Sequence, residues 1–159
     1  VGPHTKVAAV LKTHTPQRRD PETGQVTDVE IAESVAISAE LACGAVGSYR
    51  FSGVTRFPPR NAIRLYGSEG TLHYDLETVE ILGARAGDPG LTPIPISDEE
   101  ARPWTVEADF IRAIREGTPA EPSFADGALY MHFTEGVYRS ARSGRAVSLP
   151  LDDDQEIDR

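Results

Sequence analysis

The chain has 159 residues, of which 16 are basic and 25 acidic, giving a formal net charge of −9. This length suits one domain that can bury enough apolar surface to fold without disulfides, and the acidic balance excludes general attraction to nucleic acid or anionic lipid. No apolar run approaches the roughly 20 residues that span a bilayer, and the first residues do not resemble a signal peptide, so we expect a cytoplasmic protein.

The sequence contains no motif that binds a dinucleotide or a metal. Neither a Gly-x-Gly-x-x-Gly turn nor a Gly-Lys-Ser/Thr phosphate loop occurs. The histidines show no His-x-x-x-His spacing, and the single Cys43 cannot form a Cys-x-x-Cys pair. We expect this chain alone to bind no cofactor and no metal, and Cys43, set among small apolar residues, to be a buried and inert thiol.

The first third of the chain predicts two strands joined by a long loop. Residues 6–15 read as a strand, and 16–24 are rich in turn formers that cannot continue it. Within 29–41 the large apolar residues occupy alternate positions, as in a half-buried strand; they are Val29, Ile31, Val35, Ile37 and Leu41. Glu33 falls on the apolar side, which indicates either a bulge or a carboxylate held by a partner.

Two hairpins follow. Residues 43–55 alternate again and pair with the preceding strand. Strands at 62–66 and 71–76 are separated by the turn 67–70, whose two glycines permit positive φ. Two short strands are also expected, at 78–82 and, as an edge segment because of its prolines, at 91–96.

Helices are predicted only near the end. Thr105 can cap a helix that ends at Gly117, and Ser123 opens a longer one, with Asp126 completing a capping box and Gly144 closing it. A last strand is expected at 146–150. The residues 152–159 read as an acidic, solvated tail, which leaves 1–151 as the folded domain.

Strands followed by two helices indicate an α+β fold: an open-faced, largely antiparallel β-sheet with helices packed on one face. The sequence leaves open whether the helices cover the Val/Ile face of 29–41 or its Ala/Ser face. A wide sheet with one uncovered face favours a partner, and we expect a homo-oligomer formed through that face.

Four segments in this order resemble the C-terminal domain of the Gfo/Idh/MocA family, the glucose-fructose oxidoreductase and inositol dehydrogenase group. The resemblance covers about residues 7–151, and the segments that carry it are 63–72 (IRLYGSEGTL), 109–117 (DFIRAIREG), 122–127 (PSFADG) and 140–150 (SARSGRAVSLP). The resemblance implies a missing N-terminal Rossmann domain that binds NAD or NADP. It also implies that the present domain covers the nicotinamide, binds substrate and forms the oligomer through its sheet.

The resemblance assigns no catalytic residue to this chain. Family members use a lysine of a Glu-Lys-Pro segment and an Asp and a His on a helix that precedes the first strand of this domain, and none of these matches a position here. The chain starts without Met, just after the expected position of that helix, so we expect a fragment of a longer protein. The cofactor chemistry would belong to the missing half.

The resemblance does suggest substrate-binding residues in two connections. Arg18 and Arg19 lie in the loop after the first strand, where paired guanidiniums suit a carboxylate, a phosphate or sugar hydroxyls. Arg56, Phe57 and Arg60 flank Pro58-Pro59, where an aromatic edge beside a donor suits a sugar face. The alternative for both sets is an ordinary solvated connection.

Two functions of different classes follow from the sequence. The first is the substrate-binding and oligomerising domain of an NAD(P)-dependent oxidoreductase acting on a sugar, polyol or related alcohol, inactive when isolated. The second is a stand-alone ligand-binding or scaffolding module with the same fold and no catalysis. The substrate, the NAD or NADP preference and the stereochemistry are not encoded in the residues present.

Overall fold

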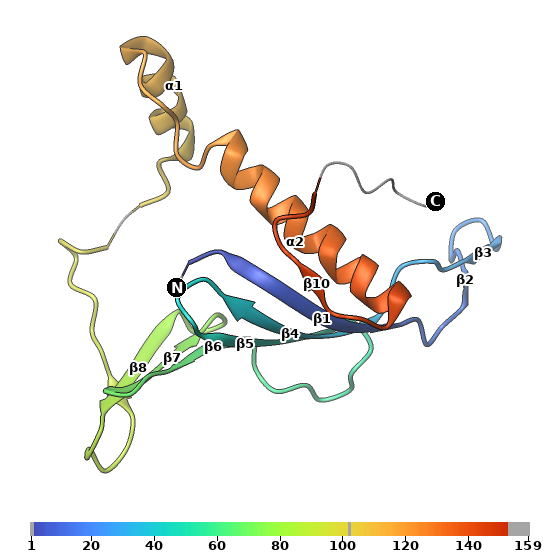
Figure 1. Ribbon diagram of the computed structural model, residues 1–159, viewed down its shortest axis with the longest axis horizontal. Coiled ribbons are helices and arrows are strands. Elements are labelled where there is room, and N and C mark those ends of the chain that lie inside the picture. Colours follow the sequence, from blue (N-terminus) through green and yellow to red (C-terminus); the bar gives the residue numbers. More distant parts are fainter. Residues whose placement is uncertain (1, 102, 153–159) are drawn as a thin grey trace. The chain divides into compact units, whose positions relative to one another are not determined.

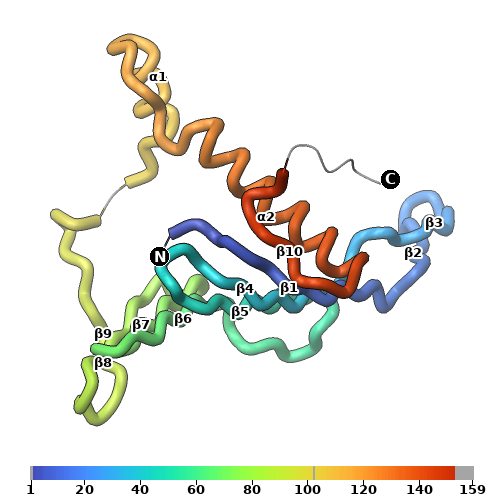
Figure 2. The backbone as a smooth tube through the Cα atoms, viewed as in Figure 1, coloured from blue at the N-terminus to red at the C-terminus, as the bar shows by residue number. Residues whose placement is uncertain are grey.

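The computed structural model describes residues 2–101 and 103–152 (Figures 1 and 2). The chain divides into two compact units, the first formed by Val1–Thr55 and Asp109–Arg159 and the second by Arg56–Ala108. Each unit has its own sheet or sheets. The α+β class and the antiparallel character of the sheets are confirmed, but the strands are divided among three sheets instead of forming one.

The main sheet of the first unit has four strands in the order β10-β1-β4-β5. Its members are β1 (His4–Lys12), β4 (Ser34–Leu41), β5 (Val46–Ser52) and β10 (Val147–Ser148). Strand β4 lies in the middle, with Ile37 opposite Ala9 of β1 and Tyr49 of β5. In this register, the alternation of apolar and small residues along the sequence places the apolar side chains on one face of the sheet and the small ones on the other.

Helix α2 (Phe124–Ser143) covers one face of that sheet (Figure 1). The predicted capping box is present, because the Ser123 hydroxyl accepts from the Asp126 amide while the Asp126 carboxylate accepts from the Ser123 amide. Gly144 ends the helix with φ 65°, in the left-handed region. The core forms where α2 meets the sheet, around Val7, Ile37, Ala39 and Val137.

The position of α2 decides which face of the sheet is covered. Ile37, Ala39 and Leu41 of β4 are buried, whereas Ala36, Ser38 and Glu40 are exposed. The helix thus covers the Val/Ile side and leaves the Ala/Ser side uncovered. We call the uncovered side the open face; its central residues are Ala8, Val10, Ala36, Ser38, Ser48 and Arg50.

The long loop expected after the first strand is instead a small antiparallel hairpin. Strands β2 (Gln17–Arg19) and β3 (Val26–Asp28) pair with Arg18 opposite Thr27. The turn formers do end β1, but their Asx-type turn, in which the Asp20 side chain accepts from the amides of Glu22 and Thr23, reverses the chain and lets the arms pair. Strand β4 begins only at Ser34, and Ile31 is exposed.

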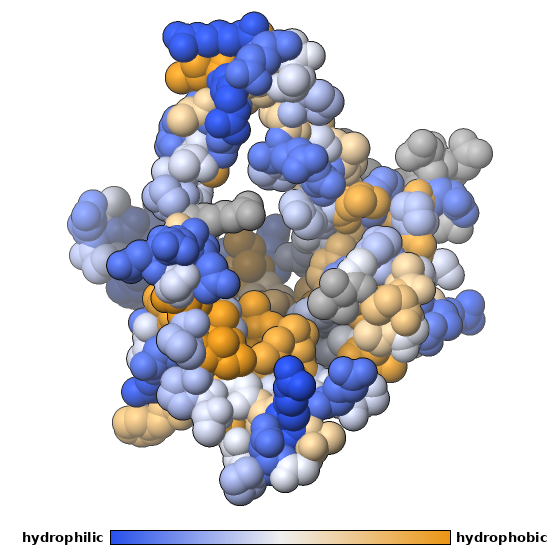
Figure 3. Space-filling model, turned by 90° about the vertical axis from the view of Figure 1, so that its left-hand side faces the viewer, coloured by the Kyte–Doolittle hydropathy of each residue, from blue (hydrophilic) through white to orange (hydrophobic). Residues whose placement is uncertain are grey.

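The second unit is a four-stranded antiparallel sheet in the order β6-β7-β8-β9. Its strands are β6 (Ala62–Tyr66), β7 (Gly70–Asp75), β8 (Glu80–Arg85) and β9 (Thr92–Pro93). The predicted hairpin is confirmed, with Gly67 donating to the Gly70 carbonyl at 2.9 Å. The positive φ expected of Gly67 and Gly70 is not observed; Gly70 is instead required by close approach, because a Cβ there would lie 2.2 Å from the Ala84 carbonyl oxygen. Figure 3 shows hydrophobic side chains exposed on the face in view, and the exposed apolar side chains of this unit include Ile63, Leu65 and Leu72.

Two further expectations differ from the structure. Helix α1 (Val106–Glu116) forms and ends at Gly117 with φ 66°, but its apolar residues Phe110 and Ile114 are exposed, so of the two helices it is α2 that buries its stripe on a sheet. Cys43 is exposed, because it lies in the tight turn between β4 and β5 where there is no core to bury it. Of the acidic tail expected at 152–159, residues 153–159 lie outside the described residues.

Candidate functional site

The base of the β2–β3 hairpin is organised by Glu33, which directly precedes β4. Its Oε2 accepts from the backbone amides of His14 and Thr15 at 2.7 and 2.6 Å, and its Oε1 accepts from Arg18 Nη2. The Glu33 side chain is 6% exposed, whereas that of Arg18 is 59% exposed. Of the two interpretations of Glu33 left by the sequence, the carboxylate held by partners is confirmed.

These donors keep Glu33 ionised. The Thr15 amide, with further hydrogen bonds from Arg18 and the His14 amide, lowers the pKa of Glu33 from 4.5 to about 2, although burial alone would raise it. A carboxylate that accepts several N–H donors is a fixed anion over the whole physiological pH range. It therefore ties the end of β1 and the first hairpin strand to the start of β4.

The two arginines of the hairpin have different surroundings. Arg18 presents its guanidinium to solvent while one nitrogen contacts Glu33. Arg19 donates from Nη1 to the Gly24 carbonyl at 2.6 Å and so closes the hairpin turn, where Gly24 has φ 73°. Neighbouring strand residues point to opposite faces, so Arg18 faces Glu33 and Arg19 hydrogen-bonds within the hairpin turn.

A row of polar side chains extends from the end of β1 across the ends of β4 and β5. His14 Nε2 lies 3.0 Å from Ser34 Oγ, and Ser34 Oγ lies 3.4 Å from Ser52 Oγ. Thr55 Oγ1 donates to Ser52 Oγ at 2.9 Å. No periodic pattern marks this group in the sequence, because its members belong to three separate segments that only the antiparallel pairing of Ser34 with Ser52 brings together.

The second set of predicted binding residues lies in the second unit. Arg60 Nη1 pairs with Asp75 Oδ2 at 3.3 Å, and Asp75 Oδ1 also accepts from the amides of Glu77 and Thr78. Those two amides, Thr78 first, lower the pKa of Asp75, and Arg60 adds to the effect. Arg56 is exposed, and Phe57 is 99% exposed with φ 51°. The hairpin arginines and this set thus belong to different units.

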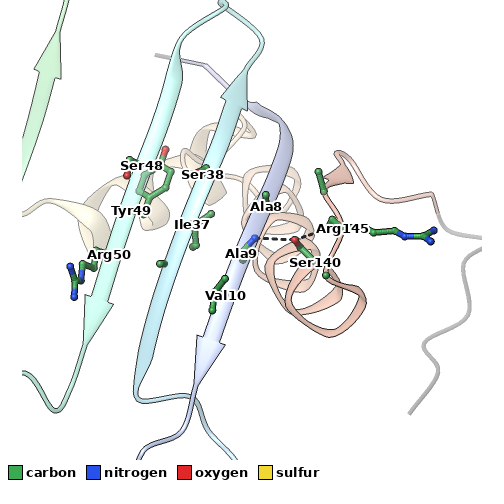
Figure 4. Close-up of a pocket in the computed structure, with 13 residues that line it drawn as sticks. Ala8, Ala9, Val10, Ile37, Ser38, Ser48, Tyr49, Arg50, Ser140 and Arg145 are labelled. Atoms are coloured by element: carbon green, nitrogen blue, oxygen red, sulfur yellow. Dashed lines mark hydrogen bonds between the residues drawn. The ribbon is translucent and has the colours of Figure 1, made fainter.

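The open face carries a shallow hollow of about 470 Å³ (Figure 4). Small side chains of β1, β4 and β5 form its floor, including Ala8, Ala36, Ser38 and Ser48, and Arg50 lies at one side of the close-up. At the other side, Ser140 Oγ accepts from the Ala9 amide at 2.9 Å and donates to the Arg145 carbonyl at 2.7 Å. No group of three or more potential metal ligands occurs in the hollow or elsewhere among the described residues.

The described strands do not form a nucleotide-binding βαβ unit. All strand pairs that the structure describes are antiparallel, whereas a nucleotide-binding βαβ unit needs parallel neighbours. The start of α2 is closed by its own Asp126 carboxylate, which would repel a pyrophosphate at the place where a helix usually attracts one. Neither described helix is long and apolar enough to cross a membrane.

Solved structures with the same fold are NAD-binding oxidoreductases. Levoglucosan dehydrogenase in complex with NADH and levoglucosan is similar with a TM-score of 0.78 and 27% identity, over 96% of this chain and 46% of that one. An oxidoreductase domain protein from Kribbella flavida matches with a TM-score of 0.75 and 25% identity, over 93% and 46%. The WlbA dehydrogenase from Bordetella pertussis, in complex with NADH and UDP-GlcNAcA, shares the fold at 22% identity and a TM-score of 0.66, over 96% and 42%.

The chain therefore spans about half the length of the oxidoreductases that it resembles. Its fold is that of one part of an NAD-binding oxidoreductase, consistent with the Gfo/Idh/MocA resemblance. No family model matches the sequence, and no curated protein matches it significantly.

Proposed function

We propose that this chain is the C-terminal, substrate-binding and oligomerising domain of a Gfo/Idh/MocA-type oxidoreductase that acts on a sugar, polyol or related alcohol with NAD or NADP. The observation that carries the proposal is the likeness to levoglucosan dehydrogenase over 96% of this chain but only 46% of that protein. The uncovered remainder of such a protein is long enough for a nucleotide-binding domain. The antiparallel sheets of this chain would form the second domain that accompanies a nucleotide-binding domain in such a protein.

In this proposal the chain positions substrate and supplies no acid, base or hydride. Arg18 and Arg19 are the proposed substrate contacts of the first unit, and Arg56, Phe57 and Arg60 are proposed, separately, as substrate contacts of the second unit. Guanidinium groups donate in a fixed geometry to hydroxyl oxygens, and an exposed aromatic ring stacks on the apolar face of a sugar ring. The Arg18–Glu33 and Arg60–Asp75 ion pairs support the assignment because they hold two of these donors in place.

The open face is the proposed contact between copies of the protein. Small side chains line the shallow hollow at its centre and permit close approach, and the face carries the exposed apolar residues Val10 and Val46, at 71% and 80% exposure. Lys6 and Glu40 form an ion pair on the same face. A twofold contact between two such faces would bury the apolar residues and repeat the polar ones symmetrically.

The test is NADH or NADPH formation by the protein at its natural length, followed by absorbance with a panel of sugars and polyols that includes levoglucosan. We expect turnover with at least one member of the panel, and no turnover by residues 1–159 alone. Nucleotide reduction by the 159-residue chain would contradict the proposal. So would a natural-length protein that binds neither NADH nor NADPH, which would favour the stand-alone binding module.

A further inference from the structure

A buried carboxylate lies behind the exposed cation of the β2–β3 hairpin. Both oxygens of Glu33 are engaged by the protein, one by the amides of His14 and Thr15 and the other by Arg18. Among the described residues, Glu33 is the hydrogen-bond partner of the Arg18 guanidinium, which makes this contact through Nη2. Most of the guanidinium donors therefore remain available to a ligand on the solvent side, while the charge of the arginine is already compensated.

The surroundings of this ion pair are acidic. The segment 17–33 contains two arginines, Arg18 and Arg19, and five carboxylates, at Asp20, Glu22, Asp28, Glu30 and Glu33. Hydrogen bonds from the Thr23 and Glu22 amides lower the pKa of Asp20, so this carboxylate also remains ionised. At physiological salt, charges within about 8 Å of each other still interact. A ligand at Arg18 would meet a hairpin whose net charge is negative.

These observations distinguish the three kinds of ligand group that an arginine can bind: a carboxylate, a phosphate and a sugar hydroxyl. A carboxylate or phosphate gains most from an arginine whose positive charge is unopposed, because the strong bond is charge-assisted. A neutral hydroxyl needs only a well-placed N–H donor. Because Glu33 compensates the charge of Arg18, a carboxylate or phosphate loses most of the charge-assisted gain, whereas a neutral hydroxyl still finds its N–H donor. The fixed negative charge of Glu33 also repels an anionic ligand.

We infer that Glu33 is a specificity-determining residue: it neutralises and positions Arg18, so that the hairpin selects an uncharged polyhydroxylated ligand and rejects carboxylated or phosphorylated ones. This inference rests on the proposed function, which places Arg18 at the substrate. Glu33 itself is buried and acts through Arg18, so it is a positioning residue. Its effect should appear in the choice between ligands.

The test compares D-glucose with D-glucuronate, and D-galactose with D-galacturonate, as probes that share a ring and differ by one carboxylate. Their affinities for the natural-length protein, with NADH present, are measured by titration calorimetry. We expect the neutral member of at least one pair to bind at least about tenfold more tightly than its acid. In the variant Glu33→Gln, which frees the charge of Arg18, the same ratio should fall by about tenfold or more.

Glu135→Gln is the matched control, because it makes the same charge change in the Glu135–Arg139 ion pair on α2 of the same unit. It should leave the ratio unchanged. Should Glu33→Gln fail to fold, Arg18→Gln serves instead: it should weaken binding of the neutral sugar without improving binding of the acid.

The inference is overturned if the acid probes bind the wild type with the same affinity as their neutral partners. It is also overturned if the affinity ratio is the same in Glu33→Gln and the wild type, or if Arg18→Gln leaves the sugar affinity unchanged. Absence of binding by all four probes would also overturn it. The proposed function is judged separately, since NAD(P)-dependent oxidation of any other alcohol would leave it standing while this inference failed.

Discussion

The Arg18 guanidinium on β2 donates to the carboxylate of Glu33, the residue directly before β4. The β2–β3 hairpin is not part of a larger sheet, and this ion pair connects it to β4, a central strand of the main sheet. Glu33 also accepts from the amides of His14 and Thr15, so the same carboxylate fixes where β1 ends. The position of a proposed substrate contact thus depends on a residue that is almost fully buried.

The first prediction concerns the pH dependence set by Glu33. Its pKa in the folded protein is about 2 against an ordinary 4.5, so the folded state binds this proton less tightly than the unfolded chain does. The stabilisation is complete above pH 4.5 and is lost as the pH falls from there towards 2. Thermal melts between pH 2 and 6 should show this loss, and Glu33→Gln should lower the melting temperature at neutral pH and flatten the acid dependence.

Glu135 on α2 provides the comparison for that experiment. Glu135→Gln should leave the acid limb of the melting curve close to that of the wild type, because its ion pair with Arg139 is partly exposed to water and spans one turn of the same helix. An identical acid limb in Glu33→Gln and the wild type would contradict the assigned role of Glu33.

A second pH effect is expected at His4. Its Nε2 lies 2.7 Å from Tyr49 Oη, its ring contacts Phe133, and burial lowers its pKa below 6.5. The folded state therefore favours the neutral ring. Its contribution is complete above pH 6.5 and is lost as the pH falls through the lowered pKa. NMR titration should give a His4 pKa below 6.5, and His4→Gln should reduce the loss of stability on acidification; an unchanged loss would contradict the prediction.

The third prediction tests the buried hydroxyl of Ser140. This side chain bridges the Ala9 amide and the Arg145 carbonyl, where β10 no longer pairs with β1. Ser140→Ala would leave both groups without their partner, at a cost of about 1–3 kcal/mol in the free energy of unfolding. Ser143→Ala is the control on the same helix, since Ser143 is exposed, and should cost no more than about 0.5 kcal/mol. Equal losses in urea denaturation would contradict the prediction.

A fourth prediction concerns the close approach of α2 to the sheet. A Cβ at Gly136 would lie 2.8 Å from Leu149 Cδ2 and 3.3 Å from Val7 Cγ2. Overpacking of this kind costs about 1–3 kcal/mol and outweighs the gain in helix propensity of about 1 kcal/mol. Gly136→Ala should therefore destabilise the protein, and Gly127→Ala, where a Cβ meets nothing within 4 Å, should be neutral or stabilising. Chemical denaturation of both variants measures the difference.

The fifth prediction tests the open face as an interface. Ser38→Arg places a long cation at the centre of the face, where Ser38 is exposed between Ala8 and Ser48. Sedimentation should show an oligomer for the wild type and a smaller species for this variant, with unchanged circular dichroism. Thr134→Arg, on the exposed surface of α2, should retain the wild-type mass. A wild type that is monomeric at micromolar concentrations would contradict the proposed assembly.

The local elements of this protein follow from its sequence. The capping box of Ser123 and Asp126, the left-handed glycines at 117 and 144 and the hairpin around residues 67–70 were predicted and are confirmed, although the two glycines of that hairpin do not adopt positive φ. Each depends on residues within a few positions of one another, so the sequence contains all the information needed. The alternation along β4 likewise defined two faces, although not which of them would be covered.

Contacts between distant segments were decided by the tertiary structure. The position of α2 over the Val/Ile side, the pairing of β2 with β3, the partners of Glu33 and the exposure of Cys43 and of the α1 stripe all depend on which segments meet. A carboxylate on an apolar face is costly or stabilising according to whether donors reach it, and those donors come from residues 15 to 19 positions away. Apart from β2 and β3, the strands and helices follow from local patterns in the sequence. Only folding determined which side chains share an environment, because burial and charge compensation are properties of a neighbourhood in space.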